Sequence, residues 1–376
     1  MVCSSLSTLP TLPRAAVATQ YFAQGASPAI STFGLYLWED WKPGGNGGSA
    51  VSLNVFKCST ATLLFLVLHI IQPCVKLPTP SAASGLFLSS FLGIIVGDSL
   101  WLWALGTLGA EQTVLLTALS PFLATVVGFL MLHQPFKPTA LIGMAIACAG
   151  IYLAQVNRTC LGRPSQQLAS ADATPQPAVQ EGGVPTEPAV QEGGVPDGLP
   201  VERKPWASEH KMKIGVAVQL VNVLLDQIGA ALTRQHGVGL STWTINLWRF
   251  GFAGGVGLLF YAAMLARTRR VANWQAELPT WAKWPSASKM DRRKWGTVLL
   301  GVLLVTFSCP ALNAYALFGM DLGVWALLGA LGPAYSPLVK LAMSRRNRTT
   351  AFGWAGAVLA GGGAALTAWC SATAAV

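Results

Sequence analysis

Residues 97–100 read GDSL, and Ser99 in this tetrapeptide has the type and the setting of a candidate nucleophile. A serine nucleophile needs a histidine base within hydrogen-bond reach and a third group that orients this base. The tetrapeptide lies in a long apolar run whose only formal charge is Asp98. The histidines of the chain show no catalytic spacing: they are His69, His133, His210 and His236. We therefore expect that the protein is not an enzyme.

Two acidic residues, Asp98 and Asp226, lie deep inside apolar segments. A charge near the centre of a bilayer costs about 2.5–3.5 kcal/mol on insertion scales, so such residues are functional candidates by default. Because a low-dielectric environment favours the neutral carboxyl group, either residue is a candidate for proton coupling or for substrate contact. The alternative for each is a structural contact with a neighbouring helix.

Two cations, Lys57 and Arg249, lie a few residues inside apolar segments, each preceded by an asparagine, Asn54 or Asn246. Their long side chains can reach the membrane interface and act as structural anchors. Alternatively, they attract an anionic group of a solute. Lys340 is a third cation that keeps an organic anion open as the substrate.

Further polar residues share the face of one expected helix. Asn222 and Asp226 are four residues apart and Gln219 precedes Asn222 by three, so all three side chains lie on the same face. Such a face should avoid lipid and contact either a solute or another helix. Other candidates for the solute site are the amide of Asn313 and the rings of Trp101, Tyr315 and Tyr335.

Three prolines, Pro121, Pro310 and Pro333, lie near the middle of apolar segments. A proline inside a helix leaves a carbonyl group without its helical partner and produces a kink. The three kinks are expected to serve either gating or simple packing.

The composition places all these residues in a membrane protein. The chain is 52% hydrophobic and 11% charged, with a mean hydropathy of +0.49, which is too apolar for a soluble domain. A helix crosses the hydrocarbon core with about 20 mostly apolar residues. Ten such runs predict an all-α integral membrane protein with ten transmembrane helices in contact with the lipid bilayer: 15–38, 54–73, 83–105, 112–132, 138–156, 213–233, 243–266, 296–318, 322–343 and 351–371.

The first of these runs is the weakest, because Gln20, Gln24, Ser27 and Pro28 interrupt it. It is either a polar helix that lines a cavity or part of a transit sequence.

Residues 157–212 have a different composition, with few large apolar side chains and with PAVQEGGVP occurring at 177–185 and again at 188–196. Such a segment cannot bury enough surface to offset its ordering entropy, so we expect a disordered linker. This linker divides the chain into residues 1–156 and 213–376, with five expected spans on each side.

The two parts resemble each other. A shift of 212 positions places ALGTLGAEQTVLLTALSP (104–121) on ALFGMDLGVWALLGALGP (316–333), and a shift of 192 places NVFK (54–57) on NLWR (246–249). With five spans per repeat, the second repeat must enter the membrane in the opposite orientation. The sequence therefore predicts two five-helix inverted repeats, an arrangement typical of secondary transporters, whose substrate site lies near the bilayer midplane.

The order of motifs resembles the EamA-like transporter family of the drug/metabolite transporter superfamily. The motifs are GDSLWLWAL (97–105), then LGA, LSP and a last span bearing Gly143 and Gly150, together with LWRF (247–250) in the second half. The chain departs from the family at LHQ (132–134) and SRR (344–346), where a Leu-Gly-Glu is common. The resemblance implies a multi-pass carrier of small organic solutes, without naming the solute.

The remaining signals limit cofactors and partners. The seven cysteines are scattered without ligand spacing, so we expect neither a metal nor another cofactor. The net charge of +10 comes mainly from loops on the side of the linker, so it reflects membrane topology rather than nucleic-acid binding. This bias puts the linker side in the cytosol. With ten spans both termini would then lie on the opposite side, whereas the family usually keeps both termini in the cytosol. Organelle and oligomeric state stay open, a homodimer included.

Two alternatives to a proton-coupled or other secondary carrier stay open. The first is an exchanger of organic anions, such as sugar phosphates or nucleotide sugars. The second is a membrane-embedded enzyme or a scaffold that transports nothing.

Overall fold

The computed structural model describes residues 14–37, 49–72, 76–108, 110–161, 205–271, 284, 291–342 and 350–373. Every regular element in these ranges is a helix. The expected linker is described only at its two ends, where the flanking helices extend to residue 161 and begin again at residue 205; the rest of it lies outside the described residues.

The first half of the chain consists of helices that follow the apolar runs. They are α1 (Arg14–Leu37), α2 (Ala50–Ile71), α3 (Pro80–Ser90), the π-helical η3 (Phe91–Gly97), α4 (Asp98–Leu108), α5 (Ala110–Thr117), α6 (Ser120–Leu132) and α7 (Pro138–Leu161). Polar caps begin two of them: the Ser49 hydroxyl accepts from the Ser52 amide at α2, and the Thr79 hydroxyl accepts from the Ala82 amide at α3.

The second half has the same kind of elements. They are α9 (Pro205–His236), α10 (Thr242–Val271), α11 (Arg292–Val302), the π-helical η5 (Leu303–Ser308), α12 (Cys309–Leu317), α13 (Leu322–Gly329), α14 (Gly332–Ala342) and α15 (Ala351–Thr373). Asp291 caps α11 by accepting a hydrogen bond from the Lys294 amide.

Eight stretches of helix among the described residues are long and apolar enough to cross a membrane. They are α2, α3 to α4, α5 to α6, α9, α10, α11 to α12, α13 to α14, and α15. Of the other two expected spans, α7 contains a shorter apolar stretch, Pro138–Ala154, and α1 is not among the candidates. The polar residues Gln20, Gln24 and Ser27, which are buried, lower the hydropathy of α1.

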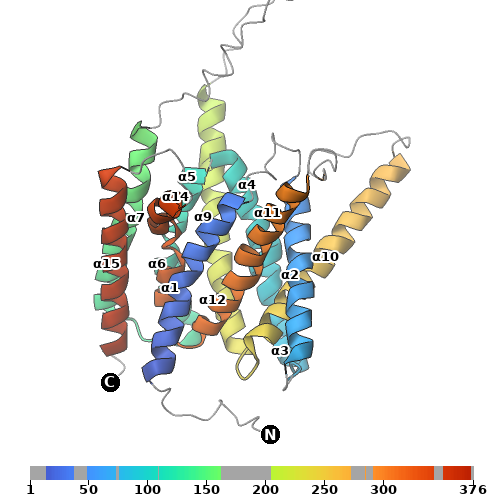
Figure 1. Ribbon diagram of the computed structural model, residues 1–376, viewed down its shortest axis with the longest axis horizontal. Coiled ribbons are helices and arrows are strands. Elements are labelled where there is room, and N and C mark those ends of the chain that lie inside the picture. The colour runs from blue at the N-terminus through green and yellow to red at the C-terminus, as the bar shows by residue number, and fades with distance from the viewer. Residues whose placement is uncertain are drawn as a thin grey trace, which may run out of the picture.

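The helices form a bundle in which most elements run along a common direction (Figure 1). In this view α1 begins and α15 ends at the lower side, whereas α7 ends and α9 begins at the upper side. The chain therefore leaves the first half and enters the second half on the side opposite to its two termini.

The pair α7 and α15 packs unusually closely. A Cβ atom added to Gly150 would lie 2.3 Å from the backbone nitrogen of Ala360, and one added to Gly363 would lie 2.4 Å from the backbone nitrogen of Ala147. These distances are far below van der Waals contact, so only glycine fits at both positions. Small residues on both helices thus let the backbones touch, as is common in membrane interfaces.

Two kinds of irregularity interrupt the expected straight spans. The π-helical segments η3 and η5 each lie in the middle of a span, and two-residue turns separate α5 from α6 and α13 from α14. Pro121 and Pro333 lie in the first turns of α6 and α14, where proline is well tolerated. Each of the two prolines thus lies directly after a short break in its span, and a role of either proline in gating stays a prediction.

Candidate functional site

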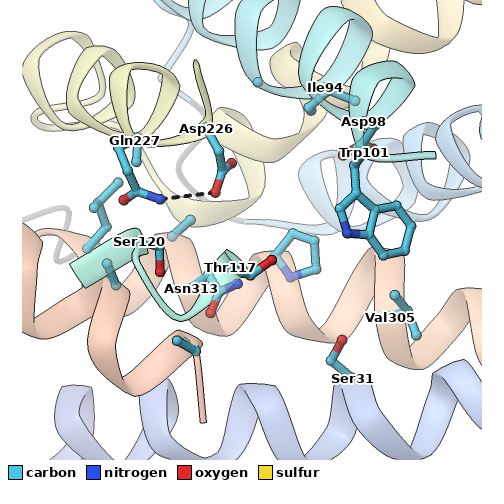
Figure 2. A pocket seen from close by; sticks show the side chains of 18 of the residues that line it. Ser31, Ile94, Asp98, Trp101, Thr117, Ser120, Asp226, Gln227, Val305 and Asn313 are labelled. Carbon is cyan, nitrogen blue, oxygen red and sulfur yellow. Dashed lines mark hydrogen bonds between the residues drawn. The ribbon is translucent and has the colours of Figure 1, made fainter. Parts of the chain in front are cut away.

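A cavity of about 420 Å³ lies between the two halves of the chain. Its walls come from α1, α2, η3, α4, α5 and α6 of the first half and from α9, α10, η5, α12 and α13 of the second. Figure 2 shows side chains from several of these helices, among them Asp98, Asp226 and Asn313, around the same space. The volume is within the range of about 300–1,000 Å³ that is usual for small-molecule sites.

Lys57 and Asp98 form an ion pair in the wall of the cavity. The Lys57 Nζ lies 2.5 Å from the Asp98 Oδ2, and the two side chains are 15% and 33% exposed. Asp98 is the first residue of α4, directly after the π-helical η3. The Asp98 carboxylate thus contacts α2 from the position directly after η3.

Asp226 and Arg249 also line the cavity, from α9 and α10. The Asp226 Oδ2 accepts a hydrogen bond of 3.3 Å from the Gln227 amide (Figure 2), and the Asp226 side chain is exposed to the cavity. The Arg249 Nε is buried and has no hydrogen-bond partner among the described residues. The Ser90 hydroxyl donates a 2.5 Å hydrogen bond to the backbone carbonyl of Arg249, which fixes α10 against α3.

Asn222 connects the second half to the irregular segment of the first. Its Nδ2 donates a 2.8 Å hydrogen bond to the carbonyl oxygen of Gly97, the last residue of η3. A π-helix makes i→i+5 hydrogen bonds, so the regular helical pattern is interrupted at this point. Asn222 therefore stabilises the turn from which Asp98 projects.

The remainder of the wall combines amides and aromatic rings. The Gln24 Nε2 donates a 2.9 Å hydrogen bond to the carbonyl of Trp325, whose indole Nε1 donates a 3.0 Å bond to the carbonyl of Asn313. Two aromatic rings also line the cavity, Trp101 from the first half of the chain and Phe250 from the second. The cavity is thus partly apolar and partly lined by hydrogen-bonding groups.

The structure brings most of the candidate site residues together. Those that line the cavity are Lys57, Asp98, Trp101, Asn222, Asp226, Arg249, Pro310 and Asn313. Three others do not line it. Gln219 is fully buried and donates hydrogen bonds to Thr113 and Thr117, Tyr315 is exposed, and Tyr335 packs against an apolar core to which α7, α13 and α15 contribute. Pro121 and Pro333 also lie outside the wall, and nothing is described for the side chain of Lys340.

Several lining residues escaped sequence reasoning. They are Ser31 of α1, Thr117, Ser120 and Thr306. Hydroxyl groups carry no strong signal in an apolar segment, because they bond their own helix: the Thr117 hydroxyl donates to the carbonyl of Thr113, four residues back. Gln24, one of the residues that made α1 a candidate polar helix beside a cavity, does line the cavity.

Ser99 lies in α4 and is not part of the cavity wall. Its hydroxyl donates a 2.5 Å hydrogen bond to the carbonyl of Ile95, one turn earlier. Among the histidines, His69 is buried beside Thr244 at 3.3 Å, and His236 packs against Gly85. In the described part of the chain Ser99 thus has no histidine base.

A second ion pair joins the two halves away from the cavity. The Lys137 Nζ lies 2.9 Å from the Asp321 Oδ2, and it also donates a 3.2 Å hydrogen bond to the carbonyl of Ser371. Their side chains are 16% and 31% exposed, nearly the same as those of the pair in the cavity. On the same side, the Arg234 guanidinium donates a 2.5 Å hydrogen bond to the carbonyl of Met320.

Comparison with known proteins supports the interpretation of the sequence. Residues 42–155 match the model of the EamA-like transporter family, so the predicted resemblance is confirmed over this segment. A solved crystal structure superposes on the chain with a TM-score of 0.60 at 13% sequence identity, covering 94% of this chain and 98% of that chain. At this identity the likeness concerns the fold alone. No curated protein matches the sequence.

The family match and the eight candidate spans make the chain an integral, multi-pass membrane protein, and together they indicate a membrane transporter.

Proposed function

We propose that the protein is a secondary carrier of small organic solutes, in which ten helices form two inverted five-helix repeats and the cavity between them binds the solute. The single observation that carries this proposal is the cavity itself, because elements of both halves line it and four of its lining residues are charged. Charged side chains are costly in a membrane, so their concentration around one space favours a solute pathway.

The helix bounds support an internal repeat. A shift of 212 places α3 (80–90) on residues 292–302, which are the bounds of α11, and places α7 (138–161) on 350–373, where α15 lies. The same shift moves η3 onto η5 with the same first residue, 303. A π-helical segment is rare, so its occurrence at matching positions favours duplication of residues 1–156 as 213–376, with the linker 157–212 between them.

The helix contacts are arranged in related pairs. The helices α2 and α10, which correspond to each other, pack together, and so do α7 and α15. The contact of α1 with α12 corresponds to that of α9 with α4. Contacts of this kind are expected from a two-fold axis in the membrane plane, and α1 and α9 begin on opposite sides of the bundle (Figure 1).

The Lys57–Asp98 pair is the proposed site of proton coupling. Protonation of Asp98 would remove the negative charge that attracts the Lys57 Nζ, which lies 2.5 Å from the Asp98 Oδ2. Both side chains line the cavity, so both are placed to contact a bound solute. A proton could thereby change both the local structure and the affinity for the solute. This is the kind of differential interaction that coupling between two conformations requires.

The alternatives have less support. An exchanger of organic anions needs an excess of cations, whereas Lys57 and Arg249 share the cavity with two carboxylates. A membrane-embedded serine hydrolase needs a base near Ser99, whose hydroxyl instead donates to a helix carbonyl. A scaffold without transport gives no reason for a charged cavity.

Uptake into proteoliposomes tests the proposal. The purified full-length protein would be reconstituted and supplied with a panel of labelled metabolites, with and without a proton gradient. Saturable uptake that depends on the gradient in the wild type and is lost in Asp98→Asn is the expected result. Asp321→Asn is the matched control, because it removes a carboxylate of similar exposure from an ion pair outside the cavity. Exchange only against preloaded solute, unaffected by Asp98→Asn, would favour an antiporter, and the absence of any uptake would contradict a carrier.

Cysteine labelling tests the ten-span topology. Variants that retain only Cys160 or only Cys370 would be treated with a membrane-impermeant maleimide in sealed, oriented vesicles. The ends of α7 and α15 lie on opposite sides of the bundle (Figure 1), so the two cysteines should react from opposite sides. Reaction of both from one side would overturn the count of ten.

A further inference from the structure

We propose that Asp226 and Arg249 form a head-group site for a zwitterionic solute, one that carries a carboxylate and an ammonium group a few ångströms apart. This inference rests on the proposed carrier function and names the substrate class of the same cavity. Three observations carry it: the charge balance of the cavity, the separation of Asp226 from Arg249, and the room left between them by Gly93.

The four charged residues of the cavity are not equivalent. Lys57 and Asp98 already neutralise each other through their 2.5 Å contact. Asp226 and Arg249, both of which the structure describes, do not form an ion pair with each other. One acid and one base in the same wall are therefore left for a ligand.

Gly93 shows how these two groups are arranged. A Cβ atom added to Gly93 would lie 3.7 Å from the Arg249 Nη2 and 3.9 Å from the Asp226 Oδ1. Both atoms lie within 4 Å of one point, so they are less than 8 Å apart. They are also too far apart for an ion pair, and the glycine leaves the space beside them free. An acidic and a basic group of one small solute fit this separation.

Both protein groups have unused hydrogen-bonding capacity. A carboxylate has about four acceptor positions, and the hydrogen bond recorded for the Asp226 side chain is the 3.3 Å one from Gln227. The Arg249 Nε has no partner among the described residues, although a guanidinium can bind a carboxylate through two parallel hydrogen bonds. A solute carboxylate at Arg249 and a solute ammonium at Asp226 would use both capacities together.

The charge balance selects against solutes with a net charge. An anion at Arg249 would leave Asp226 uncompensated and would lie close to its negative charge. A cation at Asp226 would meet the same difficulty with Arg249. Only a solute with both charges leaves every group in the cavity paired, and an unpaired charge in a low-dielectric site is costly.

The rest of the cavity fits an apolar body. Trp101, Trp325 and Phe250 line it together with aliphatic side chains. A cavity of about 420 Å³ leaves room for a side group of several carbon atoms beyond the charged end. The solute is therefore inferred to be a small zwitterion with an apolar side group.

Matched solutes test this inference. Binding to the purified full-length protein would be measured by thermal stabilisation for glycine, leucine and phenylalanine. For each side group, the amine that lacks the carboxylate and the acid that lacks the amino group would be measured as well, with glucose 6-phosphate as a net anion. We expect at least one zwitterion to bind about tenfold or more tightly than its amine and its acid, because each analogue loses one ion pair.

Charge-removing variants then test which residues are responsible. Asp226→Asn should shift the preference toward the acid, and Arg249→Gln should shift it toward the amine, whereas Asp321→Asn should leave the order unchanged. If Asp226 and Arg249 have only a structural role, each variant should weaken binding of the zwitterion, its amine and its acid by the same factor. The inference is overturned if no zwitterion binds, if an amine, an acid or glucose 6-phosphate binds best, or if the order is the same in Asp226→Asn. In those cases, uptake of any labelled metabolite into the proteoliposomes described above would still support the proposed carrier function. If no metabolite is taken up, the carrier function itself is contradicted.

Discussion

Along α7 and α15, the two halves of the chain touch through their backbones, whereas around the cavity they face each other through charged and polar side chains. The two regions belong to the same bundle and join the same two halves. In a bilayer, helices gain little from hiding apolar surface, so they associate through close packing or through polar contacts. The contact between α7 and α15 is made by small residues and leaves no space for a solute between the helices. The contact around the cavity is made by polar groups and leaves space for a solute.

This contrast suggests a division of roles. A contact in which backbones touch has one well-defined geometry and resists displacement, because any shift creates clashes or gaps. A cavity wall built from irregular helices has more than one way to satisfy its polar groups. We therefore expect mutations along α7 and α15 to act on stability, and mutations in the cavity wall to act mainly on transport.

The largest expected effect is the loss of the folded state on filling the closest contact. In Gly150→Leu the new side chain begins at a Cβ position 2.3 Å from the backbone nitrogen of Ala360, which cannot move without displacing α15. We expect destabilisation by at least about 3 kcal/mol, the upper range for overpacking. Thermal unfolding in detergent, followed by size-exclusion chromatography, measures it. Gly361→Leu on α15 is the control, since nothing lies within 4 Å of its added Cβ; equal unfolding temperatures would contradict the close packing.

Breaking the two ion pairs separates stability from transport. Lys57→Met and Lys137→Met each leave a carboxylate without its partner, and because the four side chains are 15–33% exposed we expect similar costs, about 1–2 kcal/mol each. Only Lys57→Met alters the cavity, so it alone should reduce uptake per folded protein, by at least about tenfold. Thermal unfolding and proteoliposome uptake, measured on the same preparations, decide this. An equal loss of uptake in Lys137→Met would remove the distinction between the two regions.

The sequence was a good guide to the helices and a weaker one to their interruptions. Long apolar runs with few charges predict helices, because only a helix satisfies its backbone inside a bilayer. The π-helical η3 and η5 have no comparable signal, since the residues around them are as apolar as the rest of each run. Pro121 and Pro333 marked the breaks, but the sequence did not tell a kink from a new helix start.

The candidate site shows the same limit. Asp98, Asp226, Arg249 and Lys57 were visible because charges are rare in apolar segments, and they do meet at one cavity. Gln219 carries an equally strong signal, yet its amide bonds Thr113 and Thr117 of a neighbouring helix. The pattern of one helix shows which face is polar; it does not show which partner covers that face.

A change at Gly93 sharpens the comparison by filling space in the cavity rather than at the helix contact. In Gly93→Ala the added methyl group would contact Arg249 and Asp226 at 3.7 and 3.9 Å, which are ordinary contacts, so folding should be retained. Gly93→Leu should occupy the space between the two charges and reduce uptake at least about tenfold, while the unfolding temperature changes much less than in Gly150→Leu. Uptake and thermal unfolding of both variants measure this. Normal uptake by Gly93→Leu would show that the solute does not pass between Asp226 and Arg249.

The smallest expected effect concerns Asn222, which touches both the irregular helix and the cavity. In Asn222→Leu the 2.8 Å hydrogen bond to the Gly97 carbonyl is lost while the branched shape of the side chain is kept, at a cost of about 1 kcal/mol. Because Gly97 immediately precedes Asp98, we also expect the KM for uptake to rise by about threefold, which corresponds to less than 1 kcal/mol.

The other π-helical segment supplies the control for Asn222. The Ser308 hydroxyl donates a 2.9 Å hydrogen bond to the carbonyl of Leu303 within η5, and Ser308 is not part of the cavity wall. Ser308→Ala should therefore lower the unfolding temperature slightly without raising KM. If both variants change KM equally, the two irregular segments influence the cavity alike and Asn222 has no special role in positioning Asp98. If only Asn222→Leu does, Asn222 influences the cavity in a way that the second irregular segment does not, as its hydrogen bond to the residue before Asp98 predicts.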